Sequence, residues 1–367
     1  MTDLSLRSTR FFRLLRRVRR PWTRFAERKA LGRYTALAQD LLAGLRNDGQ
    51  IDFTGATPRI TRAVRTRSDV IVLVIGDTAA GDRAMVLKLP LTAAAEQSTA
   101  AHRKVVLTLH QAPDLDRFCA LIPRSLAWGE HQGQTYYLET ALPGTAAGDL
   151  VRARAEPATL LPEAVRTIRQ LHCVTAERQV VDAAVFGRMA GEELGTLRRL
   201  APHWPDAPLL MSRLDQLEAQ LQAGLIGREL PFAWSHGDYW PGNILVCHAS
   251  GALSGIVDWD RASPQQLPLL DILHLLAYSR KMRRRTELGE EIVSYLLPEA
   301  FAPQERALLD ETLERLGLPR DSGFYRAAAL LYWLQFAATN LSRYPSFQRD
   351  HIWMRNNVFH VLKRGLS

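Results

Sequence analysis

The sequence predicts an α+β fold of two lobes, in which a small strand-rich lobe precedes a larger, mostly helical lobe. Three observations support this prediction. First, 367 residues exceed what one hydrophobic core usually organises, so two lobes or domains are expected. Second, β-branched runs and short turns characterise residues 51–141. Third, apolar residues recur at helical spacing from about residue 145 onward.

The composition is that of a globular protein, with 47% hydrophobic and 23% charged residues. A formal net charge of +9 favours anionic partners such as nucleotides, phosphorylated saccharides or a membrane surface, without choosing among them. Three scattered cysteines without a Cys-x-x-Cys pair argue for a reducing compartment. The sequence contains neither a membrane-spanning apolar run nor the apolar core of a secretory signal, so we expect a cytoplasmic protein.

Residues 1–50 are predicted to form a basic helical extension. One helical face carries the apolar residues Phe11, Leu14, Leu15, Val18, Trp22 and Phe25, and arginines surround that face. A basic amphipathic helix with aromatic residues on its apolar side can lie in the headgroup region of an anionic membrane, which would place the protein peripherally on the inner face of the cell membrane. A helix docked on the rest of the protein is an equally open interpretation. An arm that binds nucleic acid is the least favoured one.

The strand-rich segment contains two runs that predict neighbouring strands. Residues 69–75 form a β-branched run, and residues 84–90 form a second apolar run after a glycine-containing turn. Lys88 interrupts the second run. A lysine in an otherwise buried strand is costly unless its ammonium group meets negative charge, so Lys88 is a candidate anion-binding residue. A helix is predicted to follow, over residues 93–110.

The larger segment is predicted to contain a succession of amphipathic helices. We expect them at residues 160–176, at 192–224 as one or two helices, from residue 268 onward, and at 288–297, 303–316 and 324–340. The last of these is almost entirely apolar and is expected at the centre of the lobe. His172, on the first of them, is interpreted as a buried structural histidine.

The most specific chemistry lies near residues 235–260. Two short apolar runs separated by turn residues 249–252 predict a β-hairpin. In an antiparallel hairpin the start of one strand lies beside the end of the other, so Asn243 and Asp258 are expected at the same end, with Asp238 on the loop leading in. Carboxylate and amide oxygens bind hard cations such as Mg²⁺, which complete their shell with water and substrate phosphates. The pattern therefore indicates phosphoryl transfer.

The order of these three residues, with the hairpin between the last two, resembles that of the protein-kinase fold. His-Gly-Asp ending at Asp238 and Asp-Trp-Asp beginning at Asp258 resemble in particular the aminoglycoside phosphotransferase and choline kinase family. The resemblance implies a bilobal protein-kinase-like fold, with a small antiparallel β-sheet N-lobe at 51–141 and a mostly helical C-lobe at 142–367. It also implies that Asp271 braces the catalytic loop by accepting backbone hydrogen bonds. An ordinary hairpin with incidental acids is disfavoured, because order, spacing and strand context agree.

The resemblance implies a role for each polar residue of this set. Asp238 would orient the acceptor hydroxyl and receive its proton. Asn243 and Asp258 would hold Mg²⁺ between the nucleotide phosphates, with Asp260 close enough to assist. Lys88 would bind the α and β phosphates of ATP.

Backbone groups near Glu139 and Ala141 would hydrogen-bond the adenine at the hinge between the lobes.

Two features depart from the family's pattern. The phosphate-covering loop, expected at residues 63–68, contains no glycine, so the hydroxyl of Ser68 would approach the phosphates instead. The helix that follows the strand lysine has Glu96 as its only acid, near its start, and Glu96 is taken as the partner of that lysine.

Together these features predict an ATP-dependent phosphotransferase acting on a hydroxyl of a small molecule or saccharide, with polysaccharide or glycolipid metabolism as one setting. The alternative is a catalytically weak nucleotide-binding scaffold at the membrane surface, which the missing glycines and the atypical Glu96 favour. A protein kinase is disfavoured, because the 12 residues between Asp258 and Asp271 leave no room for an activation segment. The excess of arginine favours an uncharged or anionic acceptor over a polycationic aminoglycoside.

Overall fold

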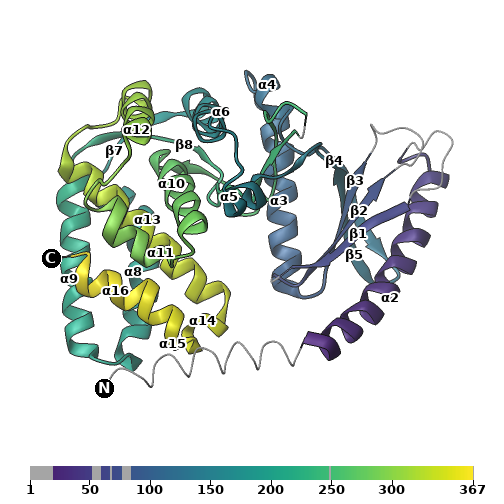
Figure 1. Cartoon of the computed structure of the whole chain (residues 1–367), viewed down its shortest axis with the longest axis horizontal. Coiled ribbons are helices and arrows are strands. Elements are labelled where there is room, and N and C mark those ends of the chain that lie inside the picture. The colour runs from purple at the N-terminus through teal and green to yellow at the C-terminus, as the bar shows by residue number, and fades with distance from the viewer. Residues whose placement is uncertain (1–19, 52–58, 67, 77–83, 248, 367) are drawn as a thin grey trace. The chain divides into compact units, whose positions relative to one another are not determined.

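The structure of the protein is a computed structural model that describes residues 20–51, 59–66, 68–76, 84–247 and 249–366, with side chains from residue 32 onward (Figure 1). The chain forms two compact units. The first consists of Met1–Arg103 and Pro123–Ala141, and the second of Lys104–Ile122 and Leu142–Ser367. The predicted α+β class, with a small antiparallel sheet and a mostly helical remainder, is confirmed. The small lobe was expected as one unbroken segment, whereas the structure assigns residues 104–122 to the helical unit.

The first unit is built on a five-stranded antiparallel sheet in the order β1-β2-β3-β5-β4 (Figure 1). Its strands are β1 (Arg59–Arg65), β2 (Val70–Gly76), β3 (Met85–Pro90), β4 (Ser125–His131) and β5 (Gln134–Thr140). Strands β2 and β3 are the two apolar runs from which the sequence predicted neighbouring strands, and they pair directly. Branched apolar side chains favour this pleated geometry because they pack well on both faces.

Helix α2 (Arg20–Asn47) packs on one face of this sheet. Its residues Ala38 and Leu42 are buried with Leu87 and Leu89 of β3 in one apolar cluster. Since successive side chains of a strand point to opposite faces, Lys88 lies on the other face, where helix α3 (Ala93–Gln111) contributes its neighbours. The docked-helix interpretation therefore describes this part of α2. The aromatic and arginine-rich stripe predicted near the N-terminus lies outside the described side chains.

The second unit is mostly helical. Its helices are α4 (Asp116–Cys119), α5 (Ala147–Ala153), α6 (Leu160–Thr175), α7 (Ala183–Phe186), α8 (Glu192–Leu200), α9 (Ala207–Leu225), α10 (Leu269–Arg284), α11 (Leu288–Glu291), α12 (Pro303–Leu316), α13 (Ser322–Arg343), α14 (Pro345–Arg349), α15 (His351–Met354) and α16 (His360–Arg364). Helix α13 packs against α8, α9 and α10, and most of its side chains are buried (Figure 1). The predicted apolar helix at 324–340 is thus the central helix of this unit, as expected.

Two small antiparallel sheets accompany these helices. The first has the order β10-β9-β6, and the second has the order β11-β8-β7. Their strands are β6 (Thr145–Ala146), β7 (Glu177–Val180), β8 (Glu229–Ser235), β9 (Ile244–Val246), β10 (Leu253–Ile256) and β11 (Ser263–Gln266). Strands β9 and β10 form the predicted hairpin, with Ile244 opposite Ile256. Strand β11 and α10 follow the hairpin at once, so no activation segment intervenes.

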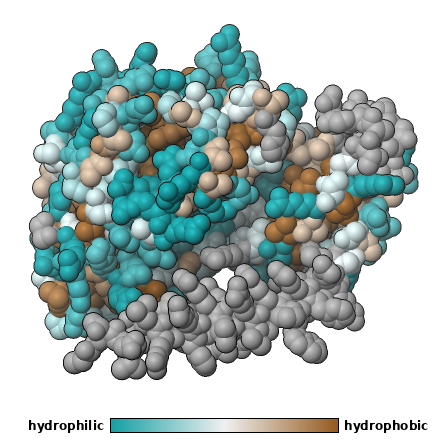
Figure 2. Space-filling model, in the orientation of Figure 1, coloured by the Kyte–Doolittle hydropathy of each residue, from teal (hydrophilic) through white to brown (hydrophobic). Residues whose placement is uncertain are grey.

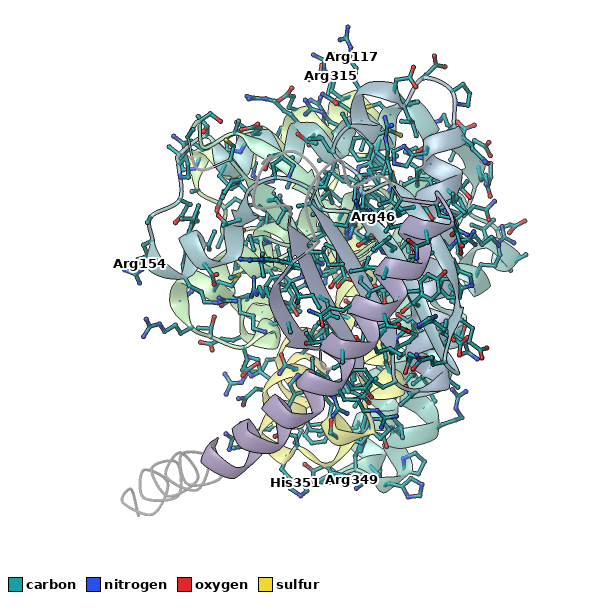
Figure 3. All side chains as sticks on the ribbon, turned by 90° about the vertical axis from the view of Figure 1, so that its right-hand side faces the viewer. Arg46, Arg117, Arg154, Arg315, Arg349 and His351 are labelled. Carbon is teal, nitrogen blue, oxygen red and sulfur yellow. The ribbon has the colours of Figure 1, made fainter. Side chains whose placement is uncertain are left out.

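The surface of the helical unit is polar. Hydrophilic residues cover most of its face in Figure 2, with hydrophobic residues in small separate groups. The exposed Arg154, Arg315 and Arg349 point outward from different elements in Figure 3, so the positive charge of this unit is not confined to one element. Among the described helices, none has the length and apolar character needed to cross a membrane.

Candidate active site

The loop that carries Asp238 is held by a carboxylate from helix α10. Asp271 is 2% exposed, and its two oxygens accept hydrogen bonds from the backbone amides of His236 (2.8 Å) and Gly237 (2.9 Å). His172 on α6 is fully buried and donates to the same carboxylate from 3.1 Å. Burial by itself would raise the pKa of Asp271, but the hydrogen bond and charge of His172 keep that pKa below its ordinary value. The bracing role expected of Asp271 is confirmed.

His236 joins this loop to the end of the hairpin. Its Nε2 lies 3.0 Å from the carbonyl oxygen of Val257, and its Nδ1 lies 3.3 Å from the amide nitrogen of Asp238. A carbonyl only accepts and an amide only donates, so Nε2 carries the hydrogen. The ring is buried 4.5 Å from the ring of Trp259, and burial lowers the pKa of His236. His236 is therefore a neutral structural connector.

Gly237 takes a backbone conformation that only glycine adopts at low cost. Its φ is +74°, and a Cβ atom at this position would lie 2.4 Å from the carbonyl oxygen of Arg261. The backbone of Arg261 cannot move away without displacing the Arg261 side chain, which contacts the carboxylate of Asp238. The close approach of these two segments accounts for the glycine in the His-Gly-Asp motif.

The carboxylate of Asp238 faces three polar side chains. Its Oδ2 accepts a hydrogen bond from Asn243 Nδ2 (3.1 Å), and its Oδ1 lies 3.4 Å from His274 Nε2 and 3.5 Å from Arg261 Nη1. Burial alone would raise the pKa of Asp238, but His274 and Arg261 hold it well below its ordinary value. Asp238 is therefore an ionised carboxylate. The sequence interpretation missed both His274 and Arg261, because neither belongs to a motif of recognisable spacing.

The hairpin brings Asn243 next to the chain segment that precedes Asp258. The amide of Val257 donates to the carbonyl of Asn243 at 2.9 Å, which continues the β9–β10 pairing by one residue. The side-chain nitrogen of Asn243 donates to both the carbonyl and the carboxylate of Asp238, so its amide oxygen is turned away from them. Asp258 is exposed and has a φ of +70°, a region that aspartate tolerates better than most residues. An amide oxygen and an exposed carboxylate suit a hard cation.

The carboxylate of Asp260 is held by an arginine side chain. Arg343 on α13 donates a short hydrogen bond to Asp260 Oδ2 and forms an ion pair with it. A cation bound at this carboxylate therefore competes with the guanidinium group. In the described part of the chain, no three His, Cys, Asp or Glu side chains form a metal-binding group by themselves. The predicted set differs from such a group because it includes an amide and leaves positions for phosphate oxygens and water.

In the first unit, Lys88 belongs to a buried ionic cluster. Its Nζ lies 2.8 Å from Glu139 Oε1, and His102 Nε2 on α3 lies 2.6 Å from Glu139 Oε2. All three side chains lie on the face of the sheet opposite α2 and are at most 14% exposed. Although burial raises the pKa of Glu139, the charges of Lys88 and His102 lower it to about 2. Lys88 is thus held by an ionised carboxylate.

This pairing differs from the expected one. Glu96 was expected beside Lys88, but Glu96 accepts a hydrogen bond from Thr135 Oγ1 at 3.0 Å, and the carboxylate beside Lys88 comes from β5 instead. The reason is position along the helix, since Glu96 lies in the first turn of α3 and His102 lies nearly two turns further on. The sequence analysis assigned a role only to the backbone of Glu139. A glutamate within an otherwise apolar strand indicates that its side chain has a charged partner, because a buried carboxylate is unfavourable without one.

The remaining predicted nucleotide residues lie in the first unit as well. The amide of Ala141, just after β5, donates to the carbonyl of Ala84 at 2.9 Å. The hydroxyl of Ser68 lies 2.9 Å from Thr66 Oγ1, which also accepts a hydrogen bond from the amide of Val70 at 3.1 Å. The turn between β1 and β2 is therefore closed by hydroxyl groups, in a segment where the family's pattern has glycines.

The Glu139 cluster is expected to make the stability of the protein depend on pH. Because the pKa of Glu139 falls from 4.5 to about 2 on folding, its contribution is fully present above about pH 4.5 and is lost as the pH falls towards 2. Glu139→Gln should therefore lower the free energy of unfolding by roughly 3 kcal/mol at pH 7, and by progressively less below pH 4.5. Urea unfolding from pH 3 to pH 7 measures this difference.

Glu130→Gln is the matched control for that measurement, since Glu130 is an exposed glutamate on β4 of the same sheet. We expect it to change the free energy of unfolding by less than about 0.5 kcal/mol at any pH. A Glu139→Gln difference that stayed constant over the whole pH range would contradict an ionic role for the cluster.

Comparison with known proteins shows one matching family model and several solved structures with a similar fold. Residues 67–309 match the model of a phosphotransferase enzyme family. A solved GDP complex of an aminoglycoside 2'-phosphotransferase is similar at a TM-score of 0.55 and 14% identity, over 91% of this chain and 96% of that chain. An aminoglycoside phosphotransferase from Streptomyces rimosus, solved with ADP and streptomycin, has a TM-score of 0.46 and 19% identity, over 81% of this chain and 97% of that chain. A glucosamine kinase has a TM-score of 0.40 and 18% identity, over 84% of this chain and 94% of that chain. No curated protein matches the chain.

Proposed function

The chain belongs to the phosphotransferase enzyme family, and we propose that this kinase transfers the γ-phosphoryl group of ATP to a hydroxyl group of a small molecule or saccharide. The observation that carries the proposal is the ionised Asp238 on a loop that Asp271 braces, hydrogen-bonded to Asn243 at the same end of the hairpin as Asp258. This is the arrangement that phosphoryl transfer needs, since positioning and charge stabilisation supply most of its catalysis.

Asp238 acts on the acceptor. Its carboxylate accepts a hydrogen bond from the acceptor hydroxyl and orients that oxygen towards the γ-phosphorus. A bond forms between the acceptor oxygen and phosphorus, the bond from phosphorus to the bridging oxygen breaks, and ADP leaves. The hydroxyl proton passes to Asp238 and then to solvent. His274 and Arg261 keep the carboxylate ionised between turnovers.

Asn243 and Asp258 are the residues that would hold Mg²⁺, through the amide oxygen and the exposed carboxylate. When bound, the cation would neutralise charge on the nucleotide phosphates. Asp260 would assist from two residues further on, in competition with Arg343, which forms an ion pair with its carboxylate.

Lys88 binds the α and β phosphates in this scheme. Glu139 and His102 keep its ammonium group in place on the sheet. The main chain near Glu139 and Ala141 is assigned to the adenine, and the hydroxyl of Ser68 to a phosphate. Because the amide of Ala141 already bonds Ala84, the carbonyl oxygen is the backbone group that Ala141 offers the base.

The test combines nucleotide binding with turnover. We expect Mg²⁺ and ATP together to raise the thermal unfolding midpoint by several degrees, because a ligand that binds only the folded state stabilises it. We also expect ADP formation that depends on an added acceptor and stops when EDTA removes the cation. An unchanged midpoint and an absence of ADP with any hydroxyl acceptor would refute the proposed function.

The turn between β1 and β2 favours a second candidate, a nucleotide-binding scaffold without turnover. The hydroxyl of Thr66 closes this turn. The turn also lacks the glycines that would let backbone amides approach phosphates freely. Such a scaffold would gain stability from Mg²⁺ and ATP but form no ADP. The same pair of measurements therefore separates the two candidates.

A further inference from the structure

A pocket of about 270 Å³ opens beside the catalytic loop, entirely within the helical unit. Arg261 and His274 belong to its lining, and both contact the carboxylate of Asp238. Gly237 of the catalytic loop lines it as well. A molecule in this pocket therefore lies next to the residue that we assign to the acceptor hydroxyl.

Two polar atoms of the pocket lining are buried without a hydrogen-bond partner among the described residues. They are Glu193 Oε2 and the hydroxyl oxygen of Tyr332. Tyr332 is 4% exposed. A buried polar group without a partner is unfavourable, so two of them at one pocket indicate that a polar ligand completes their hydrogen bonds.

Aromatic rings hold His274 in the orientation that places its Nε2 3.4 Å from Asp238 Oδ1. The imidazole is stacked on Tyr278 at a centroid distance of 4.4 Å, and it meets the edge of Tyr332 at 5.5 Å. These contacts fix the ring plane, so the imidazole supports the Asp238 carboxylate at the edge of the pocket. Burial raises the pKa of Tyr332 far above its ordinary value, so its hydroxyl keeps its hydrogen and can donate.

The charges that line the pocket are balanced. Arg261 is paired with Asp238, burial raises the pKa of Glu193, and the carboxylate of Asp271 is already bonded to two backbone amides. The other polar lining residues are the neutral Gln266, Gln335 and Thr339. A polycationic acceptor would meet Arg261, and a phosphorylated acceptor would meet Glu193 beside Asp238. Both would be buried next to a like charge, which is unfavourable.

Size and shape restrict the occupant further. A volume of about 270 Å³ lies just below the range of about 300–1,000 Å³ found for drug-sized ligands, so it suits a single ring. Phe336 and Leu270 supply an apolar wall against which the hydrocarbon face of such a ring can pack.

We propose that this pocket binds a neutral, polyhydroxylated acceptor of one sugar ring, with Glu193 and Tyr332 bonding its hydroxyl groups and Asp238 receiving the one to be phosphorylated. The proposal rests on the proposed function and names its substrate class. Hydroxyl groups both donate and accept, so they satisfy the Glu193 carboxylate and the Tyr332 hydroxyl at once.

The test compares acceptors of different charge and then removes single pocket groups. ADP formation is measured with methyl glucoside, methyl galactoside and methyl mannoside as neutral probes, kanamycin as a polycation and glucose 6-phosphate as an anion. We expect the neutral glycosides to be preferred. Tyr332→Phe and Glu193→Gln should each raise KM for the preferred glycoside about tenfold and change kcat by less than about threefold, because a ground-state hydrogen bond is lost.

Two matched controls separate pocket effects from general ones. Tyr325→Phe removes a buried hydroxyl that also lacks a partner on α13 but lies outside the pocket lining. Glu192→Gln neutralises the exposed acid next to Glu193. Both should leave KM within about twofold of the wild type. A KM rise of the same size in the controls would overturn the assignment of the pocket.

The outcomes distinguish this inference from the proposed function. Phosphorylation of kanamycin or glucose 6-phosphate in preference to every neutral glycoside would overturn the inference and leave the kinase activity standing. If no acceptor supports ADP formation, the proposed function fails, and the pocket is then tested by calorimetric titration of the three glycosides into the wild-type protein. Binding that Tyr332→Phe weakens supports the inference, and no binding of any glycoside overturns it.

Discussion

Replacing Asp238 by asparagine is expected to lower kcat for ATP turnover by about 10²- to 10⁴-fold, the usual contribution of a positioned general base. The amide keeps the size of the carboxylate and still accepts the hydrogen bond from Asn243 Nδ2. It loses the negative charge that faces Arg261 and His274, so it cannot receive the proton of the acceptor hydroxyl. Steady-state ADP formation at saturating ATP measures the effect.

Thermal unfolding of the same variant shows whether its fold is retained. We expect a single cooperative transition at a moderately lower midpoint, because Asp238 is ionised and partnered in the folded protein. Asp149→Asn is the control, since this carboxylate on α5 is 83% exposed and lies outside the catalytic loop. Undiminished turnover in Asp238→Asn would remove this residue from the mechanism.

Replacing Asp258 by alanine is expected to abolish measurable ATP turnover. The site would keep one amide oxygen, from Asn243, and lose the carboxylate that binds the cation most strongly. We therefore also expect calorimetry to show weaker binding of ATP in the presence of Mg²⁺, with little change in its absence. Asp258 is exposed, but alanine tolerates its φ of +70° less well than aspartate, so the substitution should lower the unfolding midpoint moderately without loss of the fold.

Asp260→Asn provides the comparison at the neighbouring acid. Arg343 already holds this carboxylate, so we expect its loss to reduce turnover by much less than the loss of Asp258. Equal effects of the two substitutions would assign both carboxylates to the cation directly. Full turnover in Asp258→Ala would contradict the proposed metal site.

The elements that the sequence predicted best are those whose residues are close together in the chain. Two apolar runs separated by four turn residues predicted the β9–β10 hairpin, because pairing between adjacent segments depends mainly on local pattern and turn chemistry. The apolar period of 3.6 residues predicted α6, α8, α9, α12 and α13 nearly to their ends. The order of Asp238, Asn243 and Asp258 predicted the phosphotransferase family to which the chain belongs.

The partners of the site residues could not be predicted in the same way. Glu96 was the only acid on the helix after Lys88, yet the carboxylate beside Lys88 is Glu139, more than fifty residues away in the sequence on β5. No local period relates these two residues. Only the β3–β5 pairing, which places Val86 opposite Glu139, brings their side chains onto the same face of one sheet.

The pocket beside Asp238 is the strongest example of what the tertiary structure decides. Glu193, His274 and Tyr332 come from α8, α10 and α13, and each is unremarkable within its own helix. By itself the sequence determined the secondary structure and the catalytic motif, because local periodicity and spacing encode them. The tertiary structure alone decided which distant side chains meet and which polar atoms remain without partners, because packing between helices sets those contacts.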